Sequence, residues 1–179
     1  MNVSGSHFSG IVYRAHHPMW AYLPLSGEGA KRYGGRFNRP GTATLYTALD
    51  LTTAWLEAQQ GFPFKAQPMT MVAYRVDCSD IVDLTDPQLL KNLDFTEAML
   101  GCAWEDLAWQ NLQPPTWLLA SRLLAAGFVG AKVRSFAPGC AARQHNLVLW
   151  RWGDDATHAI DVIDDFGRLP KSTEAWRET

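Results

Sequence analysis

Residues Arg32 to Gln60, RYGGRFNRPGTATLYTALDLTTAWLEAQQ, contain signals for a loop, a strand and a helix in immediate succession. Gly34 and Gly35 permit positive φ and a close approach of the backbone to a ligand, so we expect them to present Arg36 at a cleft. The planar guanidinium of arginine pairs with phosphate or carboxylate through two parallel hydrogen bonds. We therefore expect Arg36 to bind an anion.

The strand of this stretch is expected at Thr42 to Thr47, TATLYT, after a turn at residues 38–41. Its residues favour extended structure, and the turn contains proline and glycine. Because successive side chains of a strand point to opposite faces, Leu45 and Tyr46 should lie on different sides of the sheet. We expect Tyr46 to line the cleft.

The helix is predicted to begin after Asp50, a favourable N-cap, and to end at Gly61 and Pro63. Apolar residues recur at helical spacing, which predicts the buried face: Leu51, Ala54, Trp55 and Ala58. Glu57 lies off that face and on the same side as Thr53. It should therefore point either to solvent, as most glutamates do, or into a polar cleft.

Further strands are predicted at residues 11–15, 69–76, 81–84, 130–135, 146–152 and 160–163. A helical turn is expected after residues 86–87, longer helices at 96–111 and 116–126, and a long loop at 22–35. One further apolar stripe is expected in the core: Leu100, Trp104, Leu107 and Ala108. Helices and strands do not alternate strictly, which favours an α+β fold with a twisted mixed or largely antiparallel sheet and flanking helices.

The length of 179 residues is typical of a single domain. We expect one domain over residues 1–179, with a core at about 10–153 and a polar C-terminal tail. The net charge of −2 leaves no basic footprint of the kind that nucleic-acid binding requires. A local basic patch points to an anionic small molecule instead: Lys31, Arg32, Arg36 and Arg39.

Three widely separated cysteines suggest neither a disulfide framework nor a zinc site, and a reducing cytoplasm fits them best. The first residues lack the pattern of a signal peptide, and no apolar run approaches ~18 residues. We expect a cytoplasmic protein without a membrane-spanning segment.

Other polar residues are candidates for the site. Arg14 would project from the first strand as a second anion contact. His16 and His17 point apart on an extended chain, so no metal site is predicted there. Ser135 stands where a strand gives way to a loop, which suits either a binding residue or a turn. No G-x-S-x-G elbow surrounds it, which disfavours a hydrolase nucleophile.

Four blocks of the sequence resemble the RES-domain family, which is named for an arginine, a glutamate and a serine. They are Tyr13-Arg14, GGRFNRPGTATLYTALDLTTAWLE at 34–57, VRSFAPG at 133–139 and NLVLW at 146–150. The long block is the specific part. The aromatic that usually follows the arginine is here Phe37, and KVR precedes the serine where an apolar run is more usual.

The resemblance implies an NAD-consuming toxin of a bacterial toxin–antitoxin pair, with a fold similar to diphtheria-toxin-type ADP-ribosyltransferases. Family roles map onto Arg36 at the pyrophosphate, Tyr46 at the nicotinamide, Glu57 at the ribose and Ser135 at the nicotinamide or its ribose. A carboxylate at the ribose would offset the positive charge of an oxocarbenium-like transition state. Water, inorganic phosphate or a protein side chain could accept the ADP-ribosyl group.

The resemblance also implies a partner, an Xre-type helix-turn-helix antitoxin, and is compatible with a homodimer. Two other hypotheses stay open. A ribonuclease-like toxin would use His16, His17 or His145 for acid–base chemistry, although the acidic balance disfavours RNA. A non-catalytic binding domain would pair Arg36 with Glu57 as a salt bridge.

Overall fold

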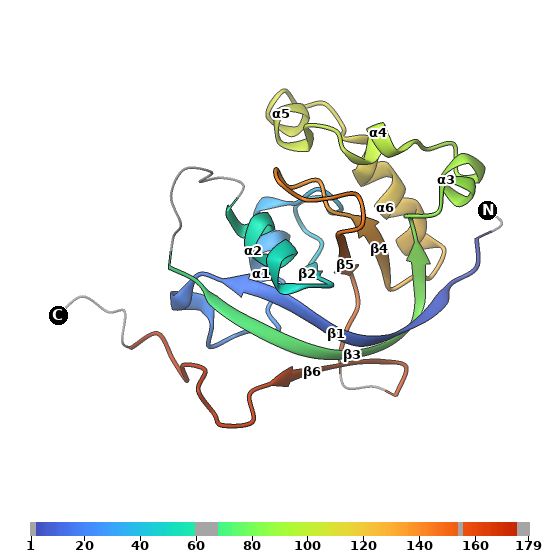
Figure 1. The fold of residues 1–179 in the computed structure, drawn as a ribbon. Helices are drawn as coiled ribbons and strands as arrows, with labels where there is room; N and C mark the ends of the chain where they lie inside the picture. The colour runs from blue at the N-terminus through green and yellow to red at the C-terminus, as the bar shows by residue number, and fades with distance from the viewer. Residues whose placement is uncertain (1–2, 60–67, 154–155, 175–179) are drawn as a thin grey trace.

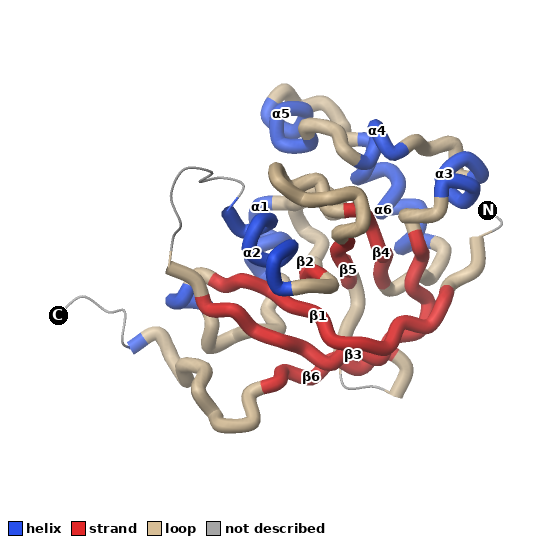
Figure 2. The backbone as a smooth tube through the Cα atoms, viewed as in Figure 1, coloured by secondary structure: helices blue, strands red, loops and turns tan. Residues whose placement is uncertain are grey.

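The structure is a computed structural model that describes residues 3–59, 68–153 and 156–174. Its strands are β1 (Ser6–His16), β2 (Leu45–Ala48), β3 (Thr70–Asp83), β4 (Gly130–Arg134), β5 (His145–Leu149) and β6 (His158–Ile163). Its helices are η1 (Pro18–Trp20), α1 (Glu28–Tyr33), α2 (Leu51–Gln59), α3 (Pro87–Asn92), α4 (Glu97–Leu100), α5 (Trp104–Trp109) and α6 (Pro115–Ala125). The predicted α+β fold is confirmed (Figures 1 and 2).

The sheet has the order β1-β2-β5-β4-β3-β6, and β1 also pairs with β3. The first five strands therefore close on themselves as a small barrel, and β6 adds to the outer edge of β3. Among the strand pairs of the described residues, only β3 and β4 run parallel, so the predicted mixed, largely antiparallel sheet is confirmed. The long strands β1 and β3 curve along each other below the helices (Figure 1).

The prediction of two separate strands at 69–76 and 81–84 was wrong, because β3 continues through both. Val76, Cys78 and Ile81 stay buried along its length. Asp80 takes a φ of 58°, a left-handed conformation that aspartate tolerates better than most residues, where the strand shifts register. β1 begins at Ser6, five residues earlier than predicted, because its pairing with β3 extends from Thr70 to Ile81.

Other element predictions were wrong in detail. The predicted loop at 22–35 contains helix α1, and the predicted helix at 96–111 is two short helices, α4 and α5. Gly101 ends α4 at its C-cap, so the apolar stripe is interrupted. Leu100 is buried as expected, whereas Trp104 is only half-buried.

The predicted buried face of α2 was wrong at Leu51 and Trp55, which are 52% and 37% exposed. Ala54 is buried as predicted, and it is joined by the polar residues Thr53 and Gln59. Asp50 caps the helix by accepting a 2.8 Å hydrogen bond from the amide of Thr53 at Oδ1. The predicted end at Gly61 and Pro63 lies outside the described residues. The face that carries Thr53 and Glu57 therefore turns toward the sheet.

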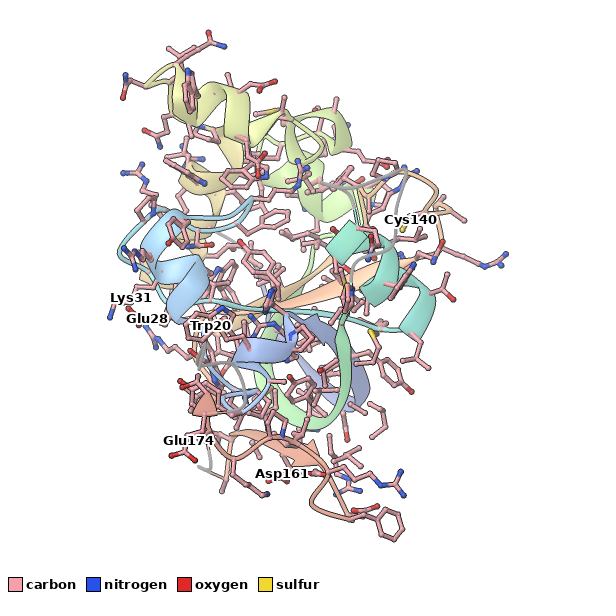
Figure 3. The ribbon with its side chains drawn as sticks, turned by 90° about the vertical axis from the view of Figure 1, so that its left-hand side faces the viewer. Trp20, Glu28, Lys31, Cys140, Asp161 and Glu174 are labelled. Atoms are coloured by element: carbon pink, nitrogen blue, oxygen red, sulfur yellow. The ribbon has the colours of Figure 1, made fainter. Side chains whose placement is uncertain are left out.

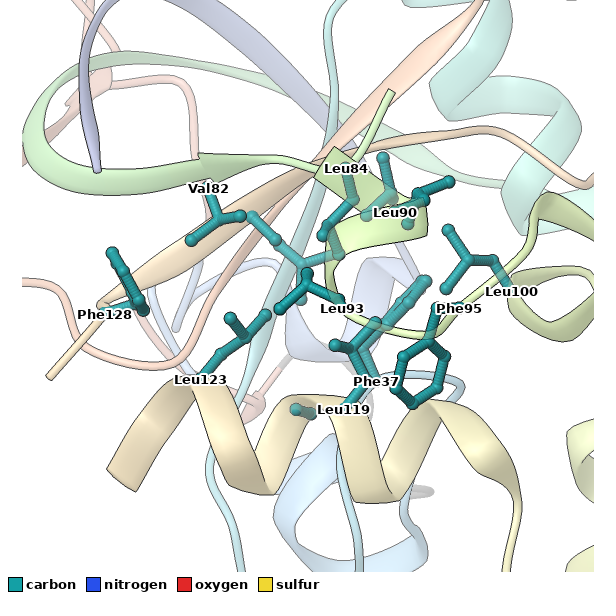
Figure 4. Close-up of a cluster of buried hydrophobic side chains, with 14 of the residues drawn as sticks. Phe37, Val82, Leu84, Leu90, Leu93, Phe95, Leu100, Leu119, Leu123 and Phe128 are labelled. Atoms are coloured by element: carbon teal, nitrogen blue, oxygen red, sulfur yellow. The ribbon is translucent and has the colours of Figure 1, made fainter. Parts of the chain in front are cut away.

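The core has two parts. One lies between the sheet and α3, α4 and α6, and it includes Phe37, Leu93, Leu119 and Leu123 (Figure 4). The other is built by strand residues such as Val12, Leu45, Tyr74 and Leu147. Phe37 thereby fixes its loop to the first part of the core. Arg36, the residue directly before Phe37, is held in place by the same contact.

Candidate active site

A cavity of about 480 Å³ opens between the loop before β2, the strands and helix α2. This volume is within the roughly 300–1,000 Å³ usual for small-molecule sites. The polar and aromatic residues of its wall come from seven parts of the chain: Tyr13, Arg14, Tyr33, Arg36, Phe37, Tyr46, Thr47, Glu57, Trp104, Arg134, Phe136 and Asn146. Four of the five predicted site residues therefore line one cavity, and Ser135 is the exception.

Glu57 is held at the cavity by two side chains that are distant in sequence. Ser135 donates from Oγ to Oε1 of Glu57 at 2.6 Å, and Asn146 donates from Nδ2 to the same oxygen at 2.5 Å. Two donors on one oxygen restrict the rotation of the carboxylate. Glu57 is thus an oriented negative charge on the cavity wall.

The polar face of α2 docks through a chain of hydrogen bonds. Gln144 donates to Oγ1 of Thr53 at 2.7 Å, and Thr53 donates to Oδ2 of Asp50 at 2.7 Å. Burial acts to raise the pKa of Asp50, but hydrogen bonds from Thr53 and Gln144 outweigh it and hold that pKa below its ordinary value. This network explains why α2 buries polar residues and leaves Leu51 in solvent.

Arg36 projects from the loop before β2 toward the α4–α5 connection. Its Nη1 donates to the carbonyl oxygens of Leu100 at 3.2 Å and Cys102 at 2.5 Å, and its guanidinium lies 5.2 Å from the centre of the Phe136 ring. Burial lowers its pKa, and Cys102 and Glu57 act in the opposite direction. Arginine stays protonated in proteins, so Arg36 places a cation on the cavity wall.

Tyr46 uses its hydroxyl to hold the loop that carries Arg36. The hydroxyl donates to Oδ1 of Asn38 at 2.8 Å and accepts from the amide of Phe37 at 2.9 Å. A Cβ on Gly35 would lie 2.6 Å from that hydroxyl oxygen, so glycine is required by the close approach of the loop. Burial raises the pKa of Tyr46, which keeps the hydroxyl neutral.

Two tryptophans fix the same loop from the side of the core. Trp117 donates from Nε1 to the carbonyl of Gly35 at 2.8 Å, and Trp150 donates to the carbonyl of Phe37 at 2.9 Å. Buried indole N–H groups need such partners. Arg36 is consequently presented by a loop whose backbone is held on both sides.

Ser135 lies behind Glu57 and does not line the cavity. It is 3% exposed, and its Oγ also accepts from the amide of Ala137 at 3.3 Å. The family resemblance implied that Ser135 positions the nicotinamide or its ribose. In the structure, Ser135 contacts the carboxylate of Glu57.

Arg14 lines the cavity from β1 and donates from Nη1 to the carbonyl of Ser26 at 3.0 Å. Burial lowers its pKa, and the nearby Tyr74 acts in the opposite direction. No salt bridge to Arg14 or Arg36 occurs among the residues that the structure describes. The cavity therefore carries two cations without a protein carboxylate bound to either.

The three histidines of the ribonuclease hypothesis do not line this cavity. His16 is buried, and its Nε2 lies 2.5 Å from the hydroxyl of Tyr74; burial and the charge of Arg14 lower its pKa to about 3. His17 caps η1 by accepting from the amide of Met19. His145 lines a second cavity of about 540 Å³ under α3 and α4.

The predicted basic patch is divided in the structure. Lys31 contacts Glu28 on the outer side of α1 at 3.4 Å, where both are exposed (Figure 3). Arg36 points into the cavity instead. Over the described ranges, no group of three or more histidine, cysteine or acidic side chains could hold a metal ion.

Sequence reasoning missed Asn146 and Trp104 as cavity residues. Asn146 begins the NLVLW block, and its position at the start of β5 was visible, but nothing local to it points to Glu57. The helical spacing of Trp104 predicts a position in the core. Gly101, which ends α4, was the signal in the sequence that could have placed Trp104 in a different helix from Leu100.

The sequence model of the RES domain matches residues 11–172. A search of curated proteins gave no match. Among solved structures, the chain is similar to one from the crystal structure of the M. tuberculosis MbcT–MbcA toxin–antitoxin complex. That likeness has a TM-score of 0.50 and 24% identity, and it covers 81% of this chain and 75% of that one. No helix in the described parts of the chain is long and apolar enough to cross a membrane.

Proposed function

The chain belongs to the RES-domain family, and we propose that it is the toxin of a toxin–antitoxin pair that consumes NAD by cleaving the bond between nicotinamide and ribose. The observation that carries this proposal is the position of Glu57. Two donors orient its carboxylate on the wall of a cavity that Arg14 and Arg36 also line.

The chemistry of cleavage suits this arrangement. As the bond to nicotinamide breaks, positive charge develops at the ribose, and a fixed carboxylate stabilises it without having to reorganise. In this proposal Glu57 acts on the ribose, and Arg36 and Arg14 bind the two phosphates of the pyrophosphate. The ring of Tyr46 borders the nicotinamide, while its hydroxyl holds the loop.

Two alternatives are less well supported. Ribonuclease chemistry would need a histidine near the anion-binding groups, yet His16 is a buried hydrogen-bond partner of Tyr74. A non-catalytic domain with an Arg36–Glu57 salt bridge is disfavoured because Arg36 donates to the carbonyls of Leu100 and Cys102. Water, inorganic phosphate and a protein side chain remain candidate acceptors for the ADP-ribosyl group.

A protein partner is part of the proposal. The similar solved structure is a complex of a toxin with its antitoxin, and we propose that this chain binds an antitoxin of the Xre helix-turn-helix type. Nucleic acid and membranes are not expected to bind directly, given the net charge of −2. Homodimer formation and a protein target for ADP-ribosylation belong to the same proposal.

The test is loss of NAD and release of nicotinamide by the purified chain. Glu57→Gln keeps the size of the side chain and removes its charge, so turnover should fall by roughly 10²-fold or more, as for other electrostatic stabilisers. Glu28→Gln is the matched control, because Glu28 is exposed and its carboxylate contacts Lys31 on the outer side of α1. A labelled RNA in the same reaction separates the alternatives: RNA cleavage without NAD loss would overturn the proposal.

A further inference from the structure

We propose that Asn146 joins Glu57 to the substrate, by donating to the carboxylate through Nδ2 and accepting a hydrogen bond from a ribose hydroxyl through Oδ1. This inference rests on the proposed function. It assigns a positioning and binding role to a residue outside the three that name the family.

The first observation is the contact with Glu57. Asn146 lies at the start of β5, opposite Ala48 on β2 and Val133 on β4, so its backbone is held from both sides. Its Nδ2 is 2.5 Å from Oε1 of Glu57, which places a rigid donor on a carboxylate that comes from a separate helix. A donor fixed in a sheet limits the positions that the end of α2 can give this carboxylate.

The second observation concerns the other end of the same amide. Oδ1 of Asn146 is buried and has no hydrogen-bond partner among the residues that the structure describes. The reverse orientation of the amide would set Oδ1 against the carboxylate oxygen, so the hydrogen-bond pattern assigns Nδ2 to Glu57. An unsatisfied buried acceptor is costly, and in a native protein it calls for an explanation.

The position of Asn146 supplies that explanation. Asn146 lines the cavity together with Glu57, whereas Ser135, which donates to the same oxygen, does not. A ribose hydroxyl is an O–H donor of the kind that Oδ1 lacks. Asn146 is therefore the donor to Glu57 that also lines the cavity.

One substitution separates this role from a merely structural one. Asn146→Asp keeps an acceptor oxygen for the ligand but sets a second carboxylate against Glu57. Two carboxylates this close share one proton, and the pKa of one of them is raised. With that proton the aspartic acid donates to Glu57 as asparagine does.

The other charged or titratable groups on the cavity wall are Tyr13, Arg14, Tyr33, Arg36, Tyr46 and Arg134.

The experiment measures kcat and KM for NAD across a pH series, with thermal unfolding of each variant as a check on folding. For Asn146→Asp we expect kcat at neutral pH to fall by roughly 10-fold or more, and to recover as the pH is lowered. Its KM should stay within about twofold of wild type, because the acceptor is kept. Asn146→Ala should lower kcat at every pH and also raise KM, since both contacts are lost.

Asn92→Asp is the charge-matched control, because Asn92 is exposed on α3 away from the cavity and should leave both constants unchanged. Equal, pH-independent losses in Asn146→Asp and Asn146→Ala would overturn the inference in favour of a structural role. Wild-type constants in either variant would overturn it too. If the wild-type chain consumed no NAD, the proposed function would fail and this inference with it.

Discussion

Ser135 donates a hydrogen bond of 2.6 Å from Oγ to Oε1 of Glu57, a residue 78 positions earlier in the chain. The contact links the end of β4 to the inner face of α2 and lies behind the wall of the cavity. Ser135 therefore positions the carboxylate of Glu57. The expected effects of substitutions around the cavity follow from contacts of this kind.

Ser135→Ala removes one of the two observed donors to Oε1 and leaves the other, from Asn146. We expect kcat for NAD cleavage to fall by roughly 10-fold, less than for Glu57→Gln, with a small change in KM. Steady-state kinetics of nicotinamide release would measure both constants. A kcat equal to that of wild type would return Ser135 to the role of a turn residue, through its contact with the amide of Ala137.

Arg36→Ala should weaken NAD binding while the fold is kept, because the side chain lies on a cavity wall. Loss of one partner of a buried charge pair costs on the order of 2–5 kcal/mol of binding free energy. Arg36→Lys should restore little, since an ammonium lacks the fork geometry of a guanidinium. Calorimetric titration with NAD measures the affinity.

Arg39→Ala is the matched control for Arg36→Ala, because Arg39 is exposed in the same loop. Equal affinities for the two alanine variants would remove Arg36 from the site.

Tyr46→Phe tests the hydroxyl separately from the ring. It leaves the amide of Phe37 and Oδ1 of Asn38 without their partner, which should lower the free energy of unfolding by about 1–3 kcal/mol and loosen the loop before Arg36. Tyr46→Ala also removes the ring from the cavity and should cost more in stability and turnover. Urea unfolding and NAD turnover would be compared for both. If Tyr46→Phe behaved like wild type in unfolding, the hydroxyl would have no role in holding the loop.

His16 should make the protein less stable in mild acid. Its pKa is lowered by burial from 6.5 to about 3, so between those values the unfolded chain binds a proton that the folded chain does not. Stability from this residue is therefore present above pH 6.5 and decreases toward pH 3, by at most ~1.4 kcal/mol per pH unit.

Urea unfolding at a series of pH values would measure this dependence. His16→Gln can keep a neutral hydrogen bond to Tyr74 and has no proton to gain, so its unfolding free energy should change less over the same range. Parallel curves for wild type and His16→Gln would contradict the assignment of the acid dependence to His16.

Local sequence determined most of the elements and the linear order of the site. The glycine pair before Arg36, the strand with Tyr46 and the capped helix with Glu57 all follow from turn chemistry and short-range periodicity. The fold class followed from the way helices and strands are interspersed. The resemblance to the RES family rested on the same stretch, and the match of the family model over residues 11–172 confirms it.

Tertiary structure alone decided which face of α2 is buried. Periodicity measures apolar residues, and it selected the face with Leu51 and Trp55, yet both are exposed. The inner face is polar because Thr53 and Glu57 find hydrogen-bond partners in Gln144, Ser135 and Asn146. Those partners lie 78 to 91 positions away, and strand pairing brings them to α2. No local pattern encodes such a contact, because it depends on the closure of the sheet.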